Sequence, residues 1–223
     1  MPATPFPEKV LQFGTGILLR GLPDYFIDKA NRLGIFNGSI LVVKSTAGPV
    51  EDFERHQFQF TTCVRGIHKG KKIEEDSINT ALSRVVSAQQ WPVILDAAIS
   101  PGLQVIISNT TEVGIRFEPE SIFQNPPASF PGKLTAVLYE RFKKLGMNSP
   151  ELVVIPTELV PDNGKKLRDI VLKLSAHNKL EAGFAGWLEQ KTLFCDSLVD
   201  RIVTQPSDAV KESLKDYNSL TIQ

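Results

Sequence analysis

The sequence predicts an α/β protein of the Rossmann-like class, with a mostly parallel sheet, helices on both faces of the sheet and a helical C-terminal extension. Short β-branched runs alternate with segments of helical spacing along the 223 residues, which favours a parallel sheet. Two such runs, at 39–43 and 105–108, are apolar at almost every position, as expected for strands buried on both faces. An earlier run, at 10–13, ends on Gly14-Thr15-Gly16, a turn typical of a strand that passes into a helix.

The first βαβ unit is complete within the first 44 residues. A strand is predicted at 10–13, a helix at 17–33 that Gly34 closes, and a strand at 39–43. The run at 58–64, with the glycines and lysines after it, indicates a hairpin or excursion that interrupts the alternation.

The later elements continue the alternation of strands and helices. Trp91-Pro92 marks a kink, or a break between two short helices, in a helix predicted at 83–100. Pro131 opens one later helix and Gly146 ends it. The remaining predictions are strands at 105–108 and 152–155, helices at 132–145, 165–174 and 207–217, and a helical extension after residue 182.

Composition excludes several classes of function. Lys and Arg total 25, as do Asp and Glu, so no net charge points to nucleic acid or to an anionic membrane. Cys63 and Cys195 are too few for a disulfide framework and too far apart for a metal motif, and we expect both to be reduced, buried and inert. No window approaches the roughly eighteen apolar residues of a membrane span, and no secretory leader is visible. We therefore expect a cytoplasmic protein without a metal.

The glycine turn is the strongest candidate binding feature. Gly14 is suited to the tight turn, and Gly16 lets a pyrophosphate approach the backbone at the start of the next helix. The fingerprint is incomplete, because Leu19 stands where the third glycine is expected and Gly21 comes two residues late. An ordinary βα turn is the alternative. Arg20 either reaches a phosphate or lies on a solvated helix face.

The end of the second predicted strand bears on the choice of cofactor. An NAD-binding domain usually has an acid there that binds the ribose hydroxyls, whereas this chain has Lys44-Ser45-Thr46. Lys44 either favours a 2′-phosphate, and hence NADP, or lies beside the adenosine. Glu51 and Asp52 are then available from the next loop.

Further polar residues follow predicted strands, where ligands lie in open α/β sheets. Lys133, in a first helical turn, opposes the macrodipole unless an anion or a neighbouring carboxylate compensates; a solvated lysine is the alternative. Glu158 would face the crevice and position substrate. Asp162 and Asn163 favour a turn and helix cap. Cofactor contacts, or a threonine-rich capping loop, are expected from Asn109, Thr110, Thr111 and Glu112.

Several strings then occur together in one order. They are LQFGTG with Arg20, SNTTE, PGKLT and LVDRIV, and together they resemble the mannitol dehydrogenase family of polyol-specific long-chain dehydrogenases. Within that family, SNTTEVGI, PGKLTAVLYERF, VVIPTELVPDNGKKLRDIVL and FCDSLVDRIVT are most similar to the branch of tagaturonate reductases, or altronate oxidoreductases. The resemblance runs from about Val10 to Thr204.

The resemblance implies a domain organisation and a reaction. Residues 1–204 would form the dinucleotide-binding domain, and residues 205–223 would begin the connection to an absent, mostly helical catalytic domain. The implied reaction is NAD-dependent hydride transfer between D-altronate and D-tagaturonate, with a mannitol- or fructuronate-type dehydrogenase, or a non-catalytic nucleotide-binding domain, as alternatives. NADP stays open because of Lys44.

The family carries its catalytic lysine in a Lys-x-x-x-x-Asn-x-x-His motif of the second domain, and this sequence lacks that motif. His56, His68 and His177 do not have its spacing, so no catalytic residue is expected and the chain alone should be inactive. The resemblance places Asp200 near nicotinamide and substrate, whereas a structural ion pair with Arg201 is the alternative. The expected cofactor contacts are Phe13, Gly14, Thr15, Gly16, Arg20, Lys44, Asn109, Thr110, Thr111 and Glu112, and the substrate-side candidates are Lys133, Glu158 and Asp200.

Overall fold

The central sheet of the protein has six strands, all parallel to their neighbours. The structure is a computed structural model that describes residues 6–45, 50–110, 114–213 and 220–222. In sheet order the strands are β5 (Leu82–Ser87), β2 (Ser39–Lys44), β1 (Glu8–Phe13), β6 (Val105–Ser108), β7 (Leu152–Pro156) and β8 (Thr192–Phe194). The chain winds outward from β1 through β2 to β5, returns to the middle at β6 and winds outward again, so the predicted Rossmann-like fold is confirmed.

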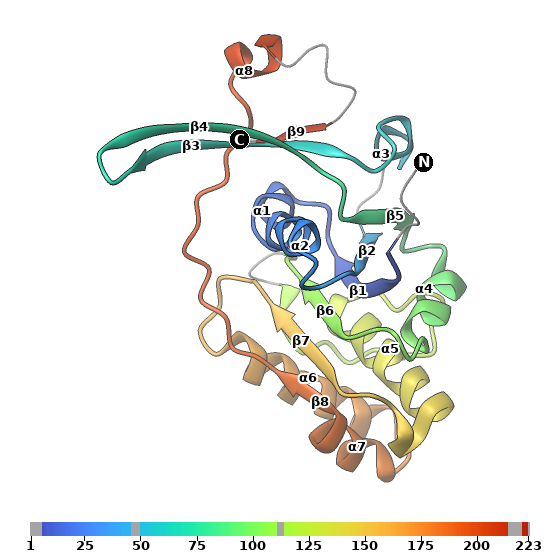
Figure 1. Cartoon of the computed structure of the whole chain (residues 1–223). Coiled ribbons are helices and arrows are strands. Elements are labelled where there is room, and N and C mark those ends of the chain that lie inside the picture. Colours follow the sequence, from blue (N-terminus) through green and yellow to red (C-terminus); the bar gives the residue numbers. More distant parts are fainter. Residues whose placement is uncertain (1–5, 46–49, 111–113, 214–219, 223) are drawn as a thin grey trace.

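Helices cover both faces of this sheet (Figure 1). One face carries α1 (Ile17–Gly21) and α2 (Pro23–Arg32). The helices of the other face are α4 (Trp91–Ala98), α5 (Phe130–Leu145), α6 (Asn163–His177) and α7 (Gly183–Lys191). The remaining helical turns are α3 (Glu51–Arg55), η2 (Gly146–Asn148) and α8 (Asp208–Ser213).

The strands bury both faces because their side chains alternate between two apolar clusters. In β1, Leu11 and Phe13 belong to the larger cluster, which lies under α4 to α7, while Val10 belongs to the smaller one with Leu19 of α1. Gln12 points to the same face as Val10 by this alternation and is 1% exposed. A polar side chain therefore sits inside the smaller core.

A long hairpin forms a second sheet beside α1 and α2 (Figure 1). Its strands are β3 (Phe60–His68) and β4 (Lys71–Asn79), antiparallel to one another, and β9 (Leu220–Ile222) pairs parallel with β3. The predicted hairpin is confirmed. Phe60 at its base is fully buried in the smaller core, which anchors the hairpin to the main sheet.

Two predicted helices are wrong in their extent. The helix expected at 17–33 is broken at Leu22, whose φ of −122° and ψ of −84° lie outside the helical region, because Pro23 begins a new helix there. In the helix expected at 83–100, the first half is the strand β5, in which Val85 and Val86 pair with β2. Only Trp91–Ala98 is helical, and Pro92 lies in its first turn.

The C-terminal part is only partly helical. After α7 the strand β8 adds a sixth strand to the sheet, paired with β7, which the sequence analysis did not foresee because the strand has three residues. The segment 195–207 has neither helix nor strand, and α8 follows it. Of the helix expected at 207–217, residues 214–217 lie outside the described part of the chain.

Arg141 joins α5 to the end of α4 from a fully buried position. Its Nη1 donates to the carbonyl oxygens of Ala98 at 2.8 Å and Ser100 at 2.7 Å. Its Nη2 donates to those of Leu103 at 3.4 Å and Pro150 at 3.5 Å. The guanidinium thus binds carbonyls at the C-terminal end of α4, in the loop between α4 and β6, and in the loop before β7. Its burial lowers its pKa.

Replacing Arg141 by Met should lower the free energy of unfolding by about 3 kcal/mol, because buried carbonyl oxygens would lose charged donors. Urea unfolding measures the change. Arg168→Met, at a position on α6 with a side chain 54% exposed, is the control and should change stability by at most about 0.5 kcal/mol. Equal losses for the two variants would contradict the role assigned to Arg141.

Candidate functional site

The glycine turn lies at the point where the winding of the sheet reverses, between β1 and β6. The amide of Gly14 donates to the carbonyl of Val43 at 3.0 Å, and the amide of Asn109 donates to the carbonyl of Phe13 at 3.2 Å. The carboxyl ends of β1, β2 and β6 therefore meet here, where open α/β sheets bind ligands. The structure brings together the turn and the start of the SNTTE loop, which are far apart in sequence.

Gly14 occupies a position that only glycine fits. Its φ is +123°, and an added Cβ would lie 2.9 Å from the carbonyl oxygen of Asn109 and 3.0 Å from Cδ1 of Leu19. Leu19 is fully buried and replaces the third glycine of the usual fingerprint. The departure from the fingerprint therefore lies inside the core and leaves the open side of the turn unchanged.

At Gly16, in contrast to Gly14, the surrounding structure leaves room for a side chain. It is exposed, its φ of −64° and ψ of 156° are ordinary, and an added Cβ would meet no atom of the described residues within 4 Å. Nothing in the fold around it requires a glycine. The missing side chain instead leaves the backbone open to a ligand.

A polar bridge supports the turn from below. Nε2 of Gln12 donates to the carbonyl of Gly14 at 3.3 Å and to Oδ2 of Asp24 at 3.4 Å. Asp24 lies in the first turn of α2 and is fully buried, and Nδ2 of Asn79 donates to its carbonyl oxygen at 2.8 Å. The sequence analysis missed this bridge, although a glutamine inside an apolar strand was a signal for it.

Burial raises the pKa of Asp24 to about 8, although the hydrogen bond from Gln12 and the positive charge of Arg20 both lower it. Oδ1 of Asp24 and Oε1 of Gln12 have no hydrogen-bond partner among the described residues. With an ionised Asp24 both atoms are acceptors without a donor. A proton on Asp24 supplies a donor, so the neutral acid fits this buried position better.

The side chain of Arg20 lies over two aromatic rings, that of Phe53 in α3 and that of Phe60 in β3. Its guanidinium carbon is 5.9 Å from the ring centroids of both Phe53 and Phe60. Burial lowers its pKa, and the charge of Asp24 opposes that shift. The solvated position considered from the sequence is therefore wrong, whereas a contact between Arg20 and a phosphate stays a prediction.

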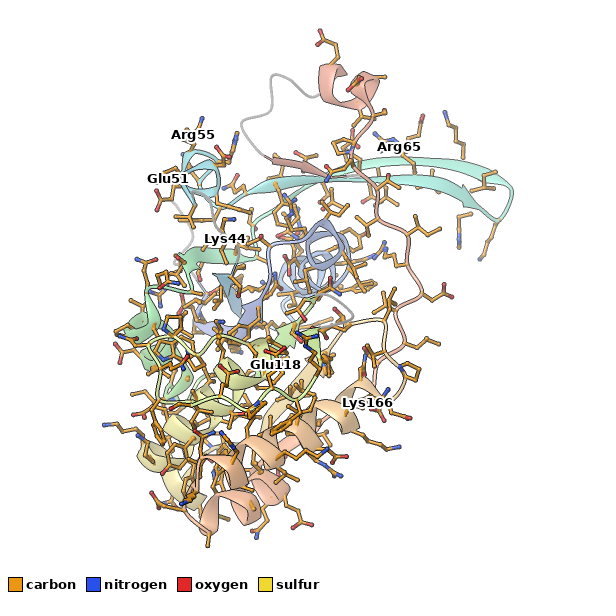
Figure 2. All side chains as sticks on the ribbon, turned by 180° about the vertical axis from the view of Figure 1, so that it is seen from behind. Lys44, Glu51, Arg55, Arg65, Glu118 and Lys166 are labelled. Carbon is orange, nitrogen blue, oxygen red and sulfur yellow. The ribbon has the colours of Figure 1, made fainter. Side chains whose placement is uncertain are left out.

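Lys44 ends β2 directly after the strand partner of Phe13. Figure 2 labels it below α3, whose Glu51 and Arg55 are exposed. The acids considered for the ribose therefore lie on a short helix, where Asp52 pairs with Arg55. The contact of Lys44 with the cofactor, through the adenosine or through a 2′-phosphate, stays a prediction.

Glu158 holds the loop that follows β6. It is 2% exposed and accepts hydrogen bonds from Oγ of Ser108 at 3.2 Å and from N and Oγ1 of Thr110 at 2.9 and 3.0 Å. Nδ2 of Asn109 donates to the carbonyl of Thr157 at 2.9 Å. These bonds fix Asn109 and Thr110 at the carboxyl edge, while contact of Glu158 with substrate stays a prediction.

Lys133 has the neighbouring carboxylate that its position requires. It is 6% exposed, its Nζ donates to the carbonyl of Ala128 at 2.7 Å, and burial lowers its pKa while Glu120 raises it. Glu120 also accepts from the amide of Ala128 at 2.7 Å and from the hydroxyl of Ser129, the N-cap of α5. The alternative of a solvated lysine is therefore wrong, and contact of Lys133 with substrate stays a prediction.

Asn163 is a structural residue, as the turn sequence indicated. It is fully buried, its Nδ2 donates to the carbonyls of Pro156 and Ser197 at 3.1 Å, and its Oδ1 accepts from the amide of Ser197 at 2.9 Å. Asp162 precedes it with a left-handed φ of +53°. The pair starts α6 and ties β7 to the segment after β8.

Asp200 and Arg201 do not form an ion pair with each other within the described chain. Asp200 is exposed, and the guanidinium carbon of Arg201 lies 5.2 Å from the ring centroid of Tyr25 and 5.3 Å from that of Phe26. The proposed contact of Asp200 with nicotinamide stays a prediction. Thr111 and Glu112 lie outside the described residues.

The described part of the chain holds no group of three or more His, Cys, Asp or Glu side chains suited to a metal ion. Cys63 and Cys195 are free, the first buried and the second half-buried. No helix within the described ranges has the length and apolar character needed to cross a membrane.

The doubly wound parallel sheet with a glycine turn at its switch point defines the class of this protein, a Rossmann-type domain. The sequence model of the mannitol dehydrogenase Rossmann domain matches residues 8–222, and the chain belongs to that family. Altronate oxidoreductases are similar to it: that of Bacillus subtilis is 39% identical over 96% of this chain and 45% of its own length. The altronate oxidoreductase of Halalkalibacterium halodurans is 38% identical over 92% of this chain and 41% of its own length. The chain thus spans less than half the length of these relatives.

Solved structures agree on the fold. The ternary complex of Pseudomonas fluorescens mannitol 2-dehydrogenase with NAD and D-mannitol superposes with a TM-score of 0.81 at 19% identity, over 98% of this chain and 48% of that one. A substrate-free D-sorbitol dehydrogenase gives a TM-score of 0.80 at 16% identity, with the same coverage of the two chains.

Replacing Asp24 by Asn should flatten the pH dependence of the free energy of unfolding between about pH 4 and pH 8. The folded-state pKa of Asp24 is raised above 3.8, so the unfolded chain releases the proton first, and stability falls as pH rises through this window. The wild type should lose on the order of 2 kcal/mol or more relative to the variant, measured by urea unfolding.

Asp169→Asn is the control for this experiment, because that carboxylate is 57% exposed on α6 and should leave the slope unchanged. A slope that is the same in the wild type and in Asp24→Asn would show that Asp24 titrates alike in the folded and unfolded chains.

Proposed function

We propose that this chain is the cofactor-binding domain of an NAD-dependent oxidoreductase that interconverts D-altronate and D-tagaturonate by hydride transfer. The observation that carries the proposal is the contrast within the turn: the fold requires glycine at Gly14, whereas Gly16 is glycine without any neighbour that requires it. A ligand that approaches the backbone closely accounts for the second glycine. The altronate oxidoreductases among the relatives support the substrate pair.

The residues around the turn fit a dinucleotide. The backbone of Thr15 and Gly16 would hold the pyrophosphate, and Gln12 fixes the carbonyl of Gly14 next to it. Asn109 and Thr110, held on the same edge by their own hydrogen bonds, would hold the nicotinamide half. Lys44 at the end of β2 would lie on the adenosine side. When bound, the nicotinamide supplies the hydride or accepts it.

NAD is the proposed cofactor, as in the complex of the related mannitol 2-dehydrogenase. The lysine in place of the usual acid makes NADP the alternative, because its charge would attract a 2′-phosphate. The proton transfer and the binding of the reacting oxygen are assigned to a second domain, as the Lys-x-x-x-x-Asn-x-x-His motif is absent from this sequence. Substrate would then bind between the two domains.

Titration with NADH and, separately, NADPH tests the proposal through the fluorescence of the bound nicotinamide. Saturable binding is expected, and Gly16→Val should abolish it, because the branched side chain occupies the space that the pyrophosphate needs. The variant should keep its fold, since no described atom lies within 4 Å of the new Cβ.

Gly66→Val is the matched control, because Gly66 lies exposed in β3 with the same open surroundings, and NADH binding should be unchanged. With D-tagaturonate added, the chain alone should oxidise no NADH. Retention of NADH binding by folded Gly16→Val would refute the assignment of the turn, and turnover would refute the assignment of catalysis to another domain.

A further inference from the structure

The glycine turn rests on two polar side chains that are closed to solvent. Gln12 is 1% exposed and Asp24 is 0% exposed. Nε2 of Gln12 lies 3.3 Å from the carbonyl oxygen of Gly14 and 3.4 Å from Oδ2 of Asp24. One amide thus joins the turn to a buried carboxyl group. A change of charge on that carboxyl group reaches the open side of the turn only through this bridge and through its electric field.

The groups around Asp24 leave its charge incompletely compensated. Among the described residues, Arg20 on α1 supplies the positive charge that lowers the pKa of Asp24, but the two side chains form no ion pair. β1 and β4 face Asp24 with the neutral amides of Gln12 and Asn79. On α2 itself, the next acid is Asp28, which is held in an ion pair of its own. An ionised Asp24 would therefore be a buried negative charge under the turn.

The two protonation states of Asp24 offer a pyrophosphate different surroundings. Burial raises the pKa of Asp24 to about 8, so both states are populated between about pH 7 and about pH 9. With the neutral acid, the positive charge of Arg20 is left unopposed. With the carboxylate, the negative charge offsets that of Arg20 and repels the pyrophosphate, and salt screens a buried charge only weakly.

We propose that the proton on Asp24 controls the affinity of the glycine turn for the pyrophosphate of the dinucleotide, with the neutral acid as the binding form. This rests on the proposed cofactor site and adds the regulation of that site by pH. Asp24 and Gln12 are positioning residues, since both side chains are closed to the ligand. Because binding and protonation are linked, bound dinucleotide must raise the pKa of Asp24 by as much as ionisation weakens binding.

Titration with NADH from about pH 6.5 to about pH 9.5, a range that spans the change of charge on Asp24, tests the proposal through nicotinamide fluorescence. The dissociation constant of the wild type should rise about tenfold across this range, the order expected for one buried charge near a charged ligand. Asp24→Asn keeps the shape of the side chain and stays neutral. Its affinity should match that of the wild type at the acid end and should be nearly independent of pH.

Asp169→Asn, at an exposed position on α6, is the matched control and should keep the wild-type dependence on pH. Circular dichroism at each pH confirms that the chains are folded. The proposal is overturned if the wild type and folded Asp24→Asn bind NADH with the same pH dependence. Absence of NADH binding at every pH would instead contradict the proposed cofactor site, and this inference with it.

The carboxyl carbon of Asp24 allows a second measurement that needs no variant. In a chain labelled with carbon-13 at aspartate, its NMR resonance should titrate with a midpoint near pH 8 in the absence of ligand. Saturating NADH should raise that midpoint by about one pH unit, which corresponds to the tenfold change in affinity. A midpoint that NADH leaves unchanged would overturn the proposal.

Discussion

The hydrogen bonds of the Gln12 amide connect the parts on which the site depends. Through its Nε2 the strand β1 is joined both to the carbonyl of Gly14 and to the carboxyl of Asp24. The second bond is possible only because the chain breaks at Leu22 and α2 starts at Pro23, which places Asp24 in a first helical turn under the glycine turn. The short α1, the break and the buried polar pair are thus parts of one arrangement, which fixes the backbone of the turn.

The acidic side chains near the site accept hydrogen bonds from other groups of the protein. Glu158 accepts three hydrogen bonds that hold the loop after β6, and Glu120 binds the start of α5 and lies beside Lys133. Asp24, with its pKa raised to about 8, is mostly neutral near pH 7. Little negative charge therefore lies under the turn, which favours an anionic group on its open side. The side chains of Asn109 and Thr110 at the carboxyl edge are held by hydrogen bonds to Thr157 and Glu158, and Lys44 ends β2 at the same edge.

Much of the fold follows from local patterns, whereas most of the site depends on distant contacts. The buried strands β2, β6 and β7 were predicted from their apolar runs, and Gly14 and Gly16 from the motif and its strand-to-helix context. The strand β5 was missed because its six residues were taken as the start of the helix that follows, and its place in the sheet comes from parallel pairing with β2, a distant segment of the chain. The pairing of Gln12 with Asp24 and of Glu158 with Thr110 likewise joins residues on different elements. No local pattern contains that information.

The most direct test of this account is a crystal structure of the chain with NADH bound. The account predicts that the pyrophosphate lies against the backbone of Thr15 and Gly16, while Gln12 keeps its bonds to Gly14 and Asp24. A pyrophosphate located elsewhere, for example at the start of α5 in place of Glu120, would contradict the assignment of the glycine turn.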